Sequence, residues 1–235
     1  MDVFGDALFD YQRGSYTEDI LTNSSLDEED VIPLPYLFRN FKAMPALEQK
    51  ALKLCRGTIL DIGCGAGSHS LYLQNKGFEV TALDESKGAI ETCLLRGIEK
   101  CIQSDIMHFT AGQFDTLLLL MNGIGLAGEL KSLGKFLSHL KKLLKPKGQI
   151  LLDSSDIIYM FEEDDDGGRW LPADQEYYGE VSFTMSYKGA KSKPFSWLYL
   201  DQNTLQQAAY VNDLNCEIVS LGEHFDYLAR LSLLT

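Results

Sequence analysis

The feature that most constrains the fold is a glycine-rich turn that follows a short apolar run. The segment Ile59–Ser70 reads I-L-D-I-G-C-G-A-G-S-H-S, with Gly63, Gly65 and Gly67 at every second position and Asp61 two residues before the first glycine. Glycines adopt positive φ readily and let a backbone come close to a ligand. The sequence therefore predicts a strand that ends at a ligand-binding turn.

Strand and helix patterns alternate along the chain from residue 57 onward. Apolar runs typical of strands occupy 58–62, 78–84, 100–105, 114–122 and 149–154. Helical patterns occupy 67–76, 86–96 and 129–144, the last with leucines at i, i+3, i+4 spacing. Such alternation implies parallel strands joined by right-handed crossovers. Two further strand patterns, at 216–222 and 225–231, close the chain after a helix at 204–213.

These patterns predict an α/β fold: a doubly wound, seven-stranded, mostly parallel sheet, with helices on both faces and an antiparallel C-terminal strand pair. Two regions lie outside the alternation. Residues 1–56 are expected to form an N-terminal helical arm or lid, loop-rich over 1–33 and helical after that. Residues 57–235 form the main domain, with an aromatic-rich insertion at about 158–200 and an acidic surface loop at Glu162–Gly168.

Composition excludes several classes of protein. The formal net charge is -13, from 21 Lys and Arg against 34 Asp and Glu, which argues against a nucleic-acid partner because phosphate binding depends on basic side chains. No apolar stretch reaches the roughly 18 residues of a membrane span, and the acidic N-terminus does not resemble a signal peptide, so we expect a cytoplasmic protein. The five cysteines form no C-x-x-C pair and are expected to be reduced thiols. The oligomeric state is not determined by these features.

The glycine spacing also separates two classes of cofactor. A dinucleotide fingerprint would read G-x-G-x-x-G, with the pyrophosphate at the start of the helix. This turn reads G-x-G-x-G, and Asp61 would repel a pyrophosphate. A carboxylate at that place suits a ligand that carries an amino or sulfonium cation.

At these residues the chain resembles a known family. L-D-I-G-C-G-A-G is similar to motif I of the class I S-adenosylmethionine-dependent methyltransferases, which have a Rossmann-like fold. The resemblance continues in order through V-T-A-L-D-E-S, Q-S-D-I-M, F-D-T-L-L-L-L-M-N and L-L-K-P-K-G-Q-I-L-L-D. It covers about residues 57 to 155, with a weaker similarity in the C-terminal strands.

The resemblance implies S-adenosyl-L-methionine as cofactor and a set of residues that bind it. Asp84 would accept the two ribose hydroxyls, and Asp105 would hold the adenine amino group beside the backbone of Ile106. Each acid also has a local interpretation: Asp61 as a turn cap, Asp84 as a helix cap and Asp105 as a surface turn residue. The full predicted set is Asp61, Gly63, Cys64, Gly65, Gly67, Asp84, Glu85, Ser86, Asp105, Ile106, Met121 and Asn122.

The resemblance further implies in-line methyl transfer, in which positioning of the acceptor supplies most of the acceleration. The sequence does not identify a general base; the candidates are Asn122, Tyr11 and His69. Asn122 could equally be a turn residue, and His69 a packed polar residue at a helix start. No metal is expected, although Asp153 and Asp156 end the fifth strand of the main domain.

The acceptor is expected to be a small molecule. The end of the fourth strand reads M-N-G-I-G and lacks the N-P-P-Y or D-P-P-Y of enzymes that methylate exocyclic amines of nucleic acid. The aromatic insertion could line a site for an apolar or ring-bearing acceptor, or it could be sheet packing. Three alternatives remain open: a non-catalytic S-adenosylmethionine-binding protein, an RNA methyltransferase and a nicotinamide-linked dehydrogenase.

Overall fold

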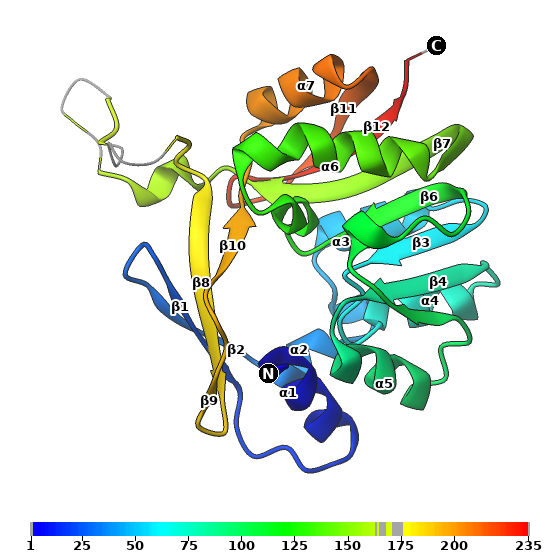
Figure 1. Cartoon of the computed structure of the whole chain (residues 1–235), viewed down its shortest axis with the longest axis vertical. Helices are drawn as coiled ribbons and strands as arrows, with labels where there is room; N and C mark the ends of the chain where they lie inside the picture. Colours follow the sequence, from blue (N-terminus) through cyan, green and yellow to red (C-terminus); the bar gives the residue numbers. More distant parts are fainter. Residues whose placement is uncertain (1, 163, 165–167, 171–175, 235) are drawn as a thin grey trace.

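A computed structural model describes residues 2–162, 164, 168–170 and 176–234. Its main sheet has seven strands in the order β11-β12-β7-β6-β3-β4-β5 (Figure 1). The strands are β3 (Ile59–Ile62), β4 (Val80–Asp84), β5 (Cys101–Gln103), β6 (Phe114–Leu119), β7 (Leu144–Ser155), β11 (Leu214–Leu221) and β12 (Asp226–Leu233).

The strand directions confirm the predicted fold class. Strands β7, β6, β3, β4 and β5 pair in parallel, and β12 pairs antiparallel with both β7 and β11. The central strands are apolar on both faces because helices cover both: all four residues of β3 are buried. Strand β3 lies at the point where the strand order reverses, which is where ligands bind in open α/β sheets.

Helices cover the two faces of this sheet (Figure 1). On one face α6 (Leu130–Lys142) and α7 (Gln202–Val211) bury their apolar stripes in the largest core cluster. On the other face lie α3 (Ala46–Leu54), α4 (Ser68–Asn75) and α5 (Lys87–Leu95). The first turns of α4 and α5 therefore begin at the carboxyl edge of the sheet, directly after β3 and β4.

The N-terminal residues are more ordered than predicted. The expectation of a loop-rich segment over 1–33 was wrong, because helix α1 (Val3–Gln12) and strands β1 (Ile20–Ser24) and β2 (Glu29–Ile32) lie there. Helix α1 buries Val3, Ala7 and Leu8. Strand β2 is an exposed edge strand with no alternation of apolar and polar residues, so its sequence carries no strand signal.

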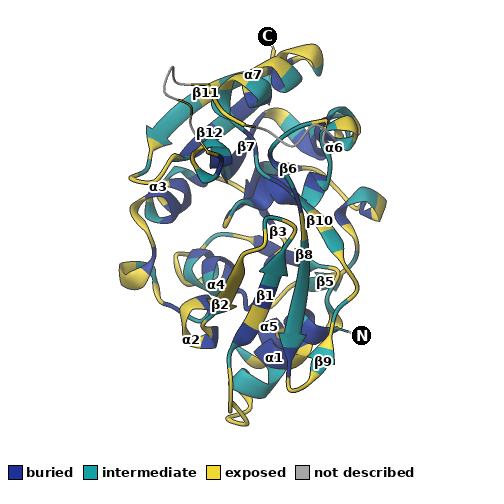
Figure 2. Cartoon of the chain, turned by 90° about the vertical axis from the view of Figure 1, so that its left-hand side faces the viewer, coloured by how far each residue is buried: buried dark blue, intermediate teal, exposed yellow. Residues whose placement is uncertain are grey.

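The N-terminal strands join the aromatic insertion in a second sheet. This small sheet has the order β10-β8-β1-β2, all antiparallel, and β9 also pairs with β8. The insertion contributes β8 (Glu180–Tyr187), β9 (Ala190–Lys191) and β10 (Phe195–Leu198). Two segments more than 150 residues apart in sequence thus form one structural unit, which stands over the carboxyl edge of the main sheet (Figures 1 and 2).

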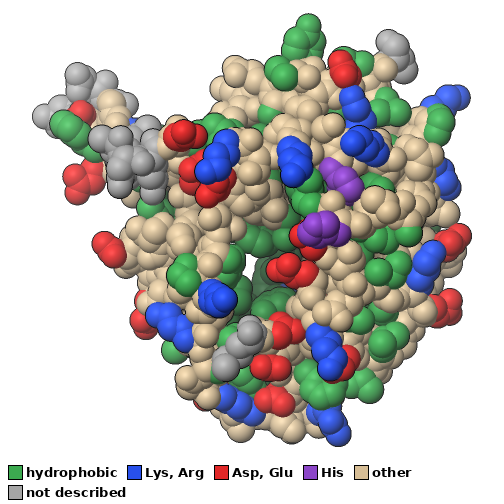
Figure 3. Space-filling view, viewed as in Figure 1, with side chains coloured by type: hydrophobic (Ala, Val, Ile, Leu, Met, Phe, Trp, Pro, Cys, Tyr) green, Lys and Arg blue, Asp and Glu red, His purple; other side chains and the backbone are tan. Residues whose placement is uncertain are grey.

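The two faces of the small sheet differ in exposure. Leu21 and Val31 share one face and are more than 40% exposed, so that face is in contact with solvent. The opposite face carries Phe183, Met185 and Phe195, which are half-buried. The space-filling view is hollowed between this inward face and the main sheet, with hydrophobic side chains inside and acidic ones at the rim (Figure 3). We call this space the central hollow.

Short helical segments complete the chain. They are α2 (Leu34–Leu37), η1 (Phe41–Ala43), η2 (Ile106–His108), η3 (Gly123–Ala127) and η4 (Ile157–Met160). The predicted acidic loop, Glu162–Gly168, lies largely outside the described residues. Within the described part of the chain, no helix has the length and apolar character needed to cross a membrane.

Candidate functional site

The glycine turn connects β3 to α4 at the switch point of the main sheet. Gly63, Gly65 and Gly67 all have positive φ, between 53° and 75°. The N–H groups of Gly63 and Cys64 both donate to the carbonyl of Leu83 on β4, at 2.8 and 3.0 Å. These hydrogen bonds hold the turn against the neighbouring strand without the help of a ligand.

The three glycines are needed for different reasons. A Cβ at Gly67 would lie 2.3 Å from Ile98 Cδ1 and 2.7 Å from Cys93 Sγ, so close packing excludes a side chain there. At Gly63 and Gly65 the nearest atoms would be 3.3 and 3.6 Å away, on side chains only. Positive φ and free space at these two positions leave their backbone open to a ligand.

Asp61 is buried at the end of β3, only 2% exposed. Its Oδ2 accepts a 2.6 Å hydrogen bond from Ser70 Oγ. Burial raises the pKa of this carboxyl, while the charge of His69 and the bond from Ser70 act in the opposite direction. The local interpretation of Asp61 as a cap of the turn is wrong, because its hydrogen-bond donor is Ser70 of helix α4 rather than an N–H group of the turn.

Asp84 ends β4 and connects the turn to the start of α5. Its Oδ2 accepts from the Gly65 N–H and its Oδ1 from the Ser86 N–H, each at 2.9 Å. Burial raises the pKa of Asp84 to about 6, and the two backbone hydrogen bonds partly offset that rise. A carboxylate offers about four acceptor positions, so two remain for a ligand's hydroxyl groups.

The neighbours of Asp84 differ in environment. Glu85 is exposed, whereas Ser86 caps α5 by accepting from the Ala89 N–H at 3.0 Å. Ser86 Oγ also donates to Asp2 Oδ2 at 2.8 Å. Asp2 Oδ2 accepts a second hydrogen bond, from the Gly88 N–H, at 3.0 Å. The N-terminus of the chain is thereby held at the edge of the predicted ribose site.

Asp105 and Ile106 follow β5, the next strand along the edge. Asp105 is exposed, accepts from the Met107 N–H at 2.8 Å and pairs with His108 at 3.2 Å. Ile106 is buried in the main core, so only its backbone is available to a ligand. This geometry agrees with the local interpretation of Asp105 as a surface turn residue, and it adds that Asp105 caps η2.

Met121 and Asn122 lie after β6 in a strained turn. Both have positive φ, 65° and 55°, which is uncommon for residues with a side chain. Asp153, at the end of β7, accepts from the Met121 and Gly123 N–H groups at 3.1 and 3.2 Å. Burial raises the pKa of Asp153 to about 7. Strain of this kind concentrates at functional sites.

His69 belongs to a buried charged network. Its Nε2 lies 2.7 Å from Glu48 Oε2 of α3, and the other oxygen of Glu48 pairs with the Arg39 guanidinium. Arg39 also donates to the Tyr36 carbonyl at 2.6 Å and stacks over the Tyr36 ring at 3.9 Å. The hydrogen bonds to His69 and Arg39 lower the pKa of Glu48 against the effect of burial.

Tyr11, the third catalytic candidate, lies in an aromatic cluster of the N-terminal segment. Its ring is 4.4 Å from Phe38 and 5.2 Å from Tyr16, and it packs against the core beneath α1. These contacts account for Tyr11 by packing.

Sequence reasoning missed Arg39 and Glu48 as partners of His69 and considered Asp153 only as a metal ligand. No spacing signal links Arg39, in the loop after α2, with Glu48 on α3 and His69 on α4, because only the tertiary fold brings them together. Among the described residues, no group of three or more His, Cys, Asp or Glu is arranged to hold a metal ion.

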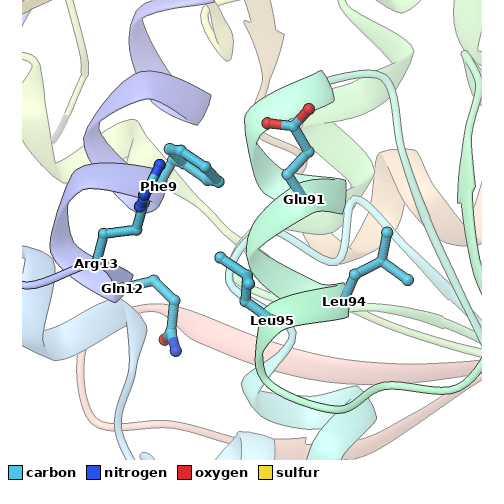
Figure 4. A pocket seen from close by; sticks show the side chains of 6 residues that line it. All are labelled: Phe9, Gln12, Arg13, Glu91, Leu94 and Leu95. Atoms are coloured by element: carbon cyan, nitrogen blue, oxygen red, sulfur yellow. The ribbon is translucent and has the colours of Figure 1, made fainter.

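A separate groove of about 660 Å³ lies between α1 and α5 (Figure 4). None of the predicted cofactor residues lines this groove. Its lining is Phe9, Gln12, Arg13, Glu91, Leu94 and Leu95.

Comparison with known proteins identifies the family. A family model described as a methyltransferase domain matches residues 60–152. The crystal structure of a SAM-dependent methyltransferase from Bacteroides fragilis, in complex with S-adenosyl-L-homocysteine, is 42% identical; the match covers all of this chain and 95% of that one, with a TM-score of 0.92. The chain belongs to the S-adenosylmethionine-dependent methyltransferases. S-adenosyl-L-methionine is the cofactor of this family, and the resemblance seen in residues 57–155 is confirmed.

Some other methyltransferases share less sequence with this chain. The chain is 30% identical over 167 residues to a demethylmenaquinone methyltransferase of Leptospira interrogans, covering 63% of each protein. It is 33% identical over 99 residues to a ubiquinone biosynthesis O-methyltransferase of Caulobacter vibrioides, covering 38% of that protein. The chain thus matches less than two thirds of the length of these curated relatives. The CcbJ methyltransferase of Streptomyces caelestis, 13% identical with a TM-score of 0.65, shares the fold.

Proposed function

We propose that this methyltransferase transfers a methyl group from S-adenosyl-L-methionine to a small-molecule acceptor held in the central hollow. The observation that carries the proposal is the position of the hollow. It lies between the apolar inward face of the small sheet and the strand ends where the glycine turn, Asp84 and Asp153 meet. The cofactor, when bound, supplies an electrophilic methyl group on a sulfonium, which leaves as a neutral sulfide.

The residues at the strand ends fit this cofactor. Asp84 keeps two acceptor positions for the vicinal hydroxyls of the ribose, as its two hydrogen bonds imply. Gly63 and Gly65 offer open backbone to the methionine part, and Asp61 supplies negative charge near its ammonium and sulfonium groups. Asp105 and Ile106 would take the adenine, the first by its carboxylate and the second by its backbone.

The chain's contribution to the reaction is orientation and exclusion of water. The half-buried Phe183, Met185, Phe195 and Trp197 on the inward face give the hollow an apolar wall, which favours an acceptor with an apolar or ring-bearing body. A Cβ at Gly125 would lie 2.1 Å from Trp197 Nε1, so β10 is packed tightly on the segment after β6. A rigid wall of this kind holds an acceptor atom in line with the methyl group.

Helix α1 serves as a lid over the cofactor in this proposal. The Phe4 ring is the nearest group to the open side of Gly65, and Asp2 bonds to Ser86 and Gly88 at the start of α5. The two helices cross so closely that a Cβ at Gly88 would lie 2.4 Å from the backbone of Gly5. Entry of the cofactor would then require α1 to move away from α5.

Two measurements test the proposal. Calorimetry with S-adenosylhomocysteine should show binding, and incubation with [methyl-³H]S-adenosylmethionine and a small-molecule extract of bacterial cells should label at least one metabolite. Binding without transfer to any fraction would favour the non-catalytic alternative. Transfer only to purified tRNA or rRNA would favour the RNA methyltransferase.

A further inference from the structure

Arg39, Glu48 and His69 form a buried polar network that the packing of α3 on α4 does not require. All three side chains are at least nine-tenths buried, and they come from three separate segments. Burying a charge costs free energy unless the charge is paired, so the hydrogen bonds within the network must offset the desolvation of these side chains. The packing of α3 and α4 also has an apolar contribution from Leu47, Leu52 and Leu73.

We propose that His69 is the general base of the methyl transfer, and that Glu48, itself held by Arg39, is the residue that positions it. This inference rests on the proposed function. It assigns a proton-transfer role that the cofactor-binding residues do not fill.

Hydrogen bonding to Glu48 determines the tautomer of the His69 ring. The lowered pKa of Glu48 keeps its carboxyl ionised, and a carboxylate only accepts hydrogen bonds. His69 Nε2 must therefore donate, which leaves the lone pair of the neutral ring on Nδ1. Within the described residues Nδ1 has no hydrogen-bond partner, and 10% of the side chain remains accessible. A base needs both a free lone pair and an open side.

His69 lies beside the glycine turn, at the end of the site proposed for the methionine part of the cofactor. It is the second residue of α4, and the next residue, Ser70, donates to Asp61 at the end of β3. The charge of His69 acts on the pKa of both Asp61 and Asp153, at the carboxyl ends of β3 and β7. Glu48 is the carboxylate in direct contact with the ring, and Arg39 pairs with the other oxygen of Glu48. The Glu48 carboxylate can balance the charge of the imidazolium that forms when the base takes a proton.

The step balances in atoms and charge. The acceptor's heteroatom gives its proton to His69 Nδ1 and uses its electron pair to bond to the methyl carbon. The methyl carbon's bond to sulfur breaks, and that electron pair stays on sulfur. One positive charge is present before the step, on the sulfonium, and one afterwards, on the imidazolium. The proton then returns to solvent through the open side of the ring.

A purely structural network is the alternative, and His69→Gln separates the two. A glutamine amide can still donate to Glu48 but cannot take a proton. General-base catalysis is worth about 100-fold or more in rate, so His69→Gln should lower labelling of the extract acceptor by roughly that factor. Its thermal midpoint and its affinity for S-adenosylhomocysteine should stay close to wild type. His224→Gln, at an exposed loop position, is the matched control and should retain full activity.

A split between rate and affinity supplies a second readout. Glu48→Gln removes the carboxylate that holds His69 Nε2, so it should lower the labelling rate at saturating S-adenosylmethionine and leave the KM for S-adenosylmethionine close to the wild-type value. Undiminished transfer by His69→Gln, or a loss in Glu48→Gln that appears only in that KM, would overturn the base assignment alone. Absence of transfer by the wild type would instead refute the proposed function and this inference together.

Discussion

Replacing Asp84 with Asn tests the cofactor site at its most connected residue. The two carboxylate oxygens accept one backbone N–H each, from Gly65 and Ser86, and their remaining positions would accept the ribose hydroxyls. An amide nitrogen cannot accept a hydrogen bond. In Asp84→Asn that nitrogen faces one of the two backbone N–H groups, about 3 Å away, and a ribose hydroxyl loses its charged acceptor.

The magnitude follows from these two losses. A hydrogen bond to a charged group contributes about 1.5–3 kcal/mol to binding. The backbone N–H that faces the amide nitrogen loses its acceptor, which costs about 1 kcal/mol more when the site closes over the cofactor. The sum, about 2.5–4 kcal/mol, corresponds to a Kd for S-adenosylhomocysteine that is about 60- to 1,000-fold higher. Calorimetry measures this directly. The control is Glu85→Gln, an exposed neighbour with no such bonds, which should change Kd less than about threefold.

The reasoning would be refuted if Asp84→Asn bound S-adenosylhomocysteine as tightly as wild type while remaining folded.

The raised pKa of Asp84 gives a pH dependence with a definite sign. Only the ionised carboxyl can accept both ribose hydroxyls, and its pKa of about 6 lies above the usual value near 3.9. Affinity for S-adenosylhomocysteine should be constant above pH 7 and fall about tenfold per pH unit below 6. Stability without cofactor changes the other way: the folded state binds this proton more tightly than the unfolded state, so this group favours folding as pH falls from 7 toward 4. An affinity unchanged at pH 5 would contradict the assignment.

Three further substitutions test the packing around the site. Gly67→Ala should lower the free energy of unfolding by about 1 kcal/mol because of the positive φ, and by about 1–3 kcal/mol more because the methyl group overpacks the site. Gly77 also has positive φ but open space around it, so Gly77→Ala should lose only the first amount. Equal urea midpoints for the two variants would contradict this. Gly88→Ala should push α1 away and speed dissociation of S-adenosylhomocysteine in stopped-flow measurements, and an unchanged rate would argue against the lid. Glu48→Ala should lower the free energy of unfolding by about 3–5 kcal/mol because it leaves a buried guanidinium unpaired, and a loss under about 1 kcal/mol would indicate that Arg39 reaches water.

The main sheet could be predicted because its signals are local. In strand β6 the consecutive residues Leu117, Leu118 and Leu119 are all buried, and the leucines of α6 recur at helical spacing. The spacing of the glycines from Gly63 to Gly67 predicts the turn directly from the sequence. Even so, the sequence could not show that Gly67 is required by packing on Cys93 whereas Gly65 has an open side.

The small sheet could not be predicted because its pairing is not local. Strand β1 pairs with β8, so that Leu21 lies opposite Ser186 although most of the main domain separates them in the sequence. The edge strand β2 is polar and exposed, so it lacks the alternation by which strands are recognised. The central hollow is bounded by this sheet, so it could not be predicted from the sequence either.

The charged network has the same explanation. Arg39, Glu48 and His69 stand 9 and 21 residues apart, with no spacing that marks a shared site. His69 alone could be read as a packed polar residue or as a base, and the structure adds the partner that fixes its tautomer. Tyr11 shows the opposite case, since its position in the arm suggested chemistry and its contacts with Phe38 and Tyr16 explain it by packing.

A crystal structure with S-adenosylhomocysteine bound tests the central claim most directly. The account predicts both ribose hydroxyls on Asp84, and a sulfur that faces the central hollow between the inward face of the small sheet and the ends of β3, β6 and β7. His69 Nδ1 should open onto the space beyond the sulfur. A cofactor bound in the groove between α1 and α5, or a sulfur directed away from the hollow into solvent, would contradict the account.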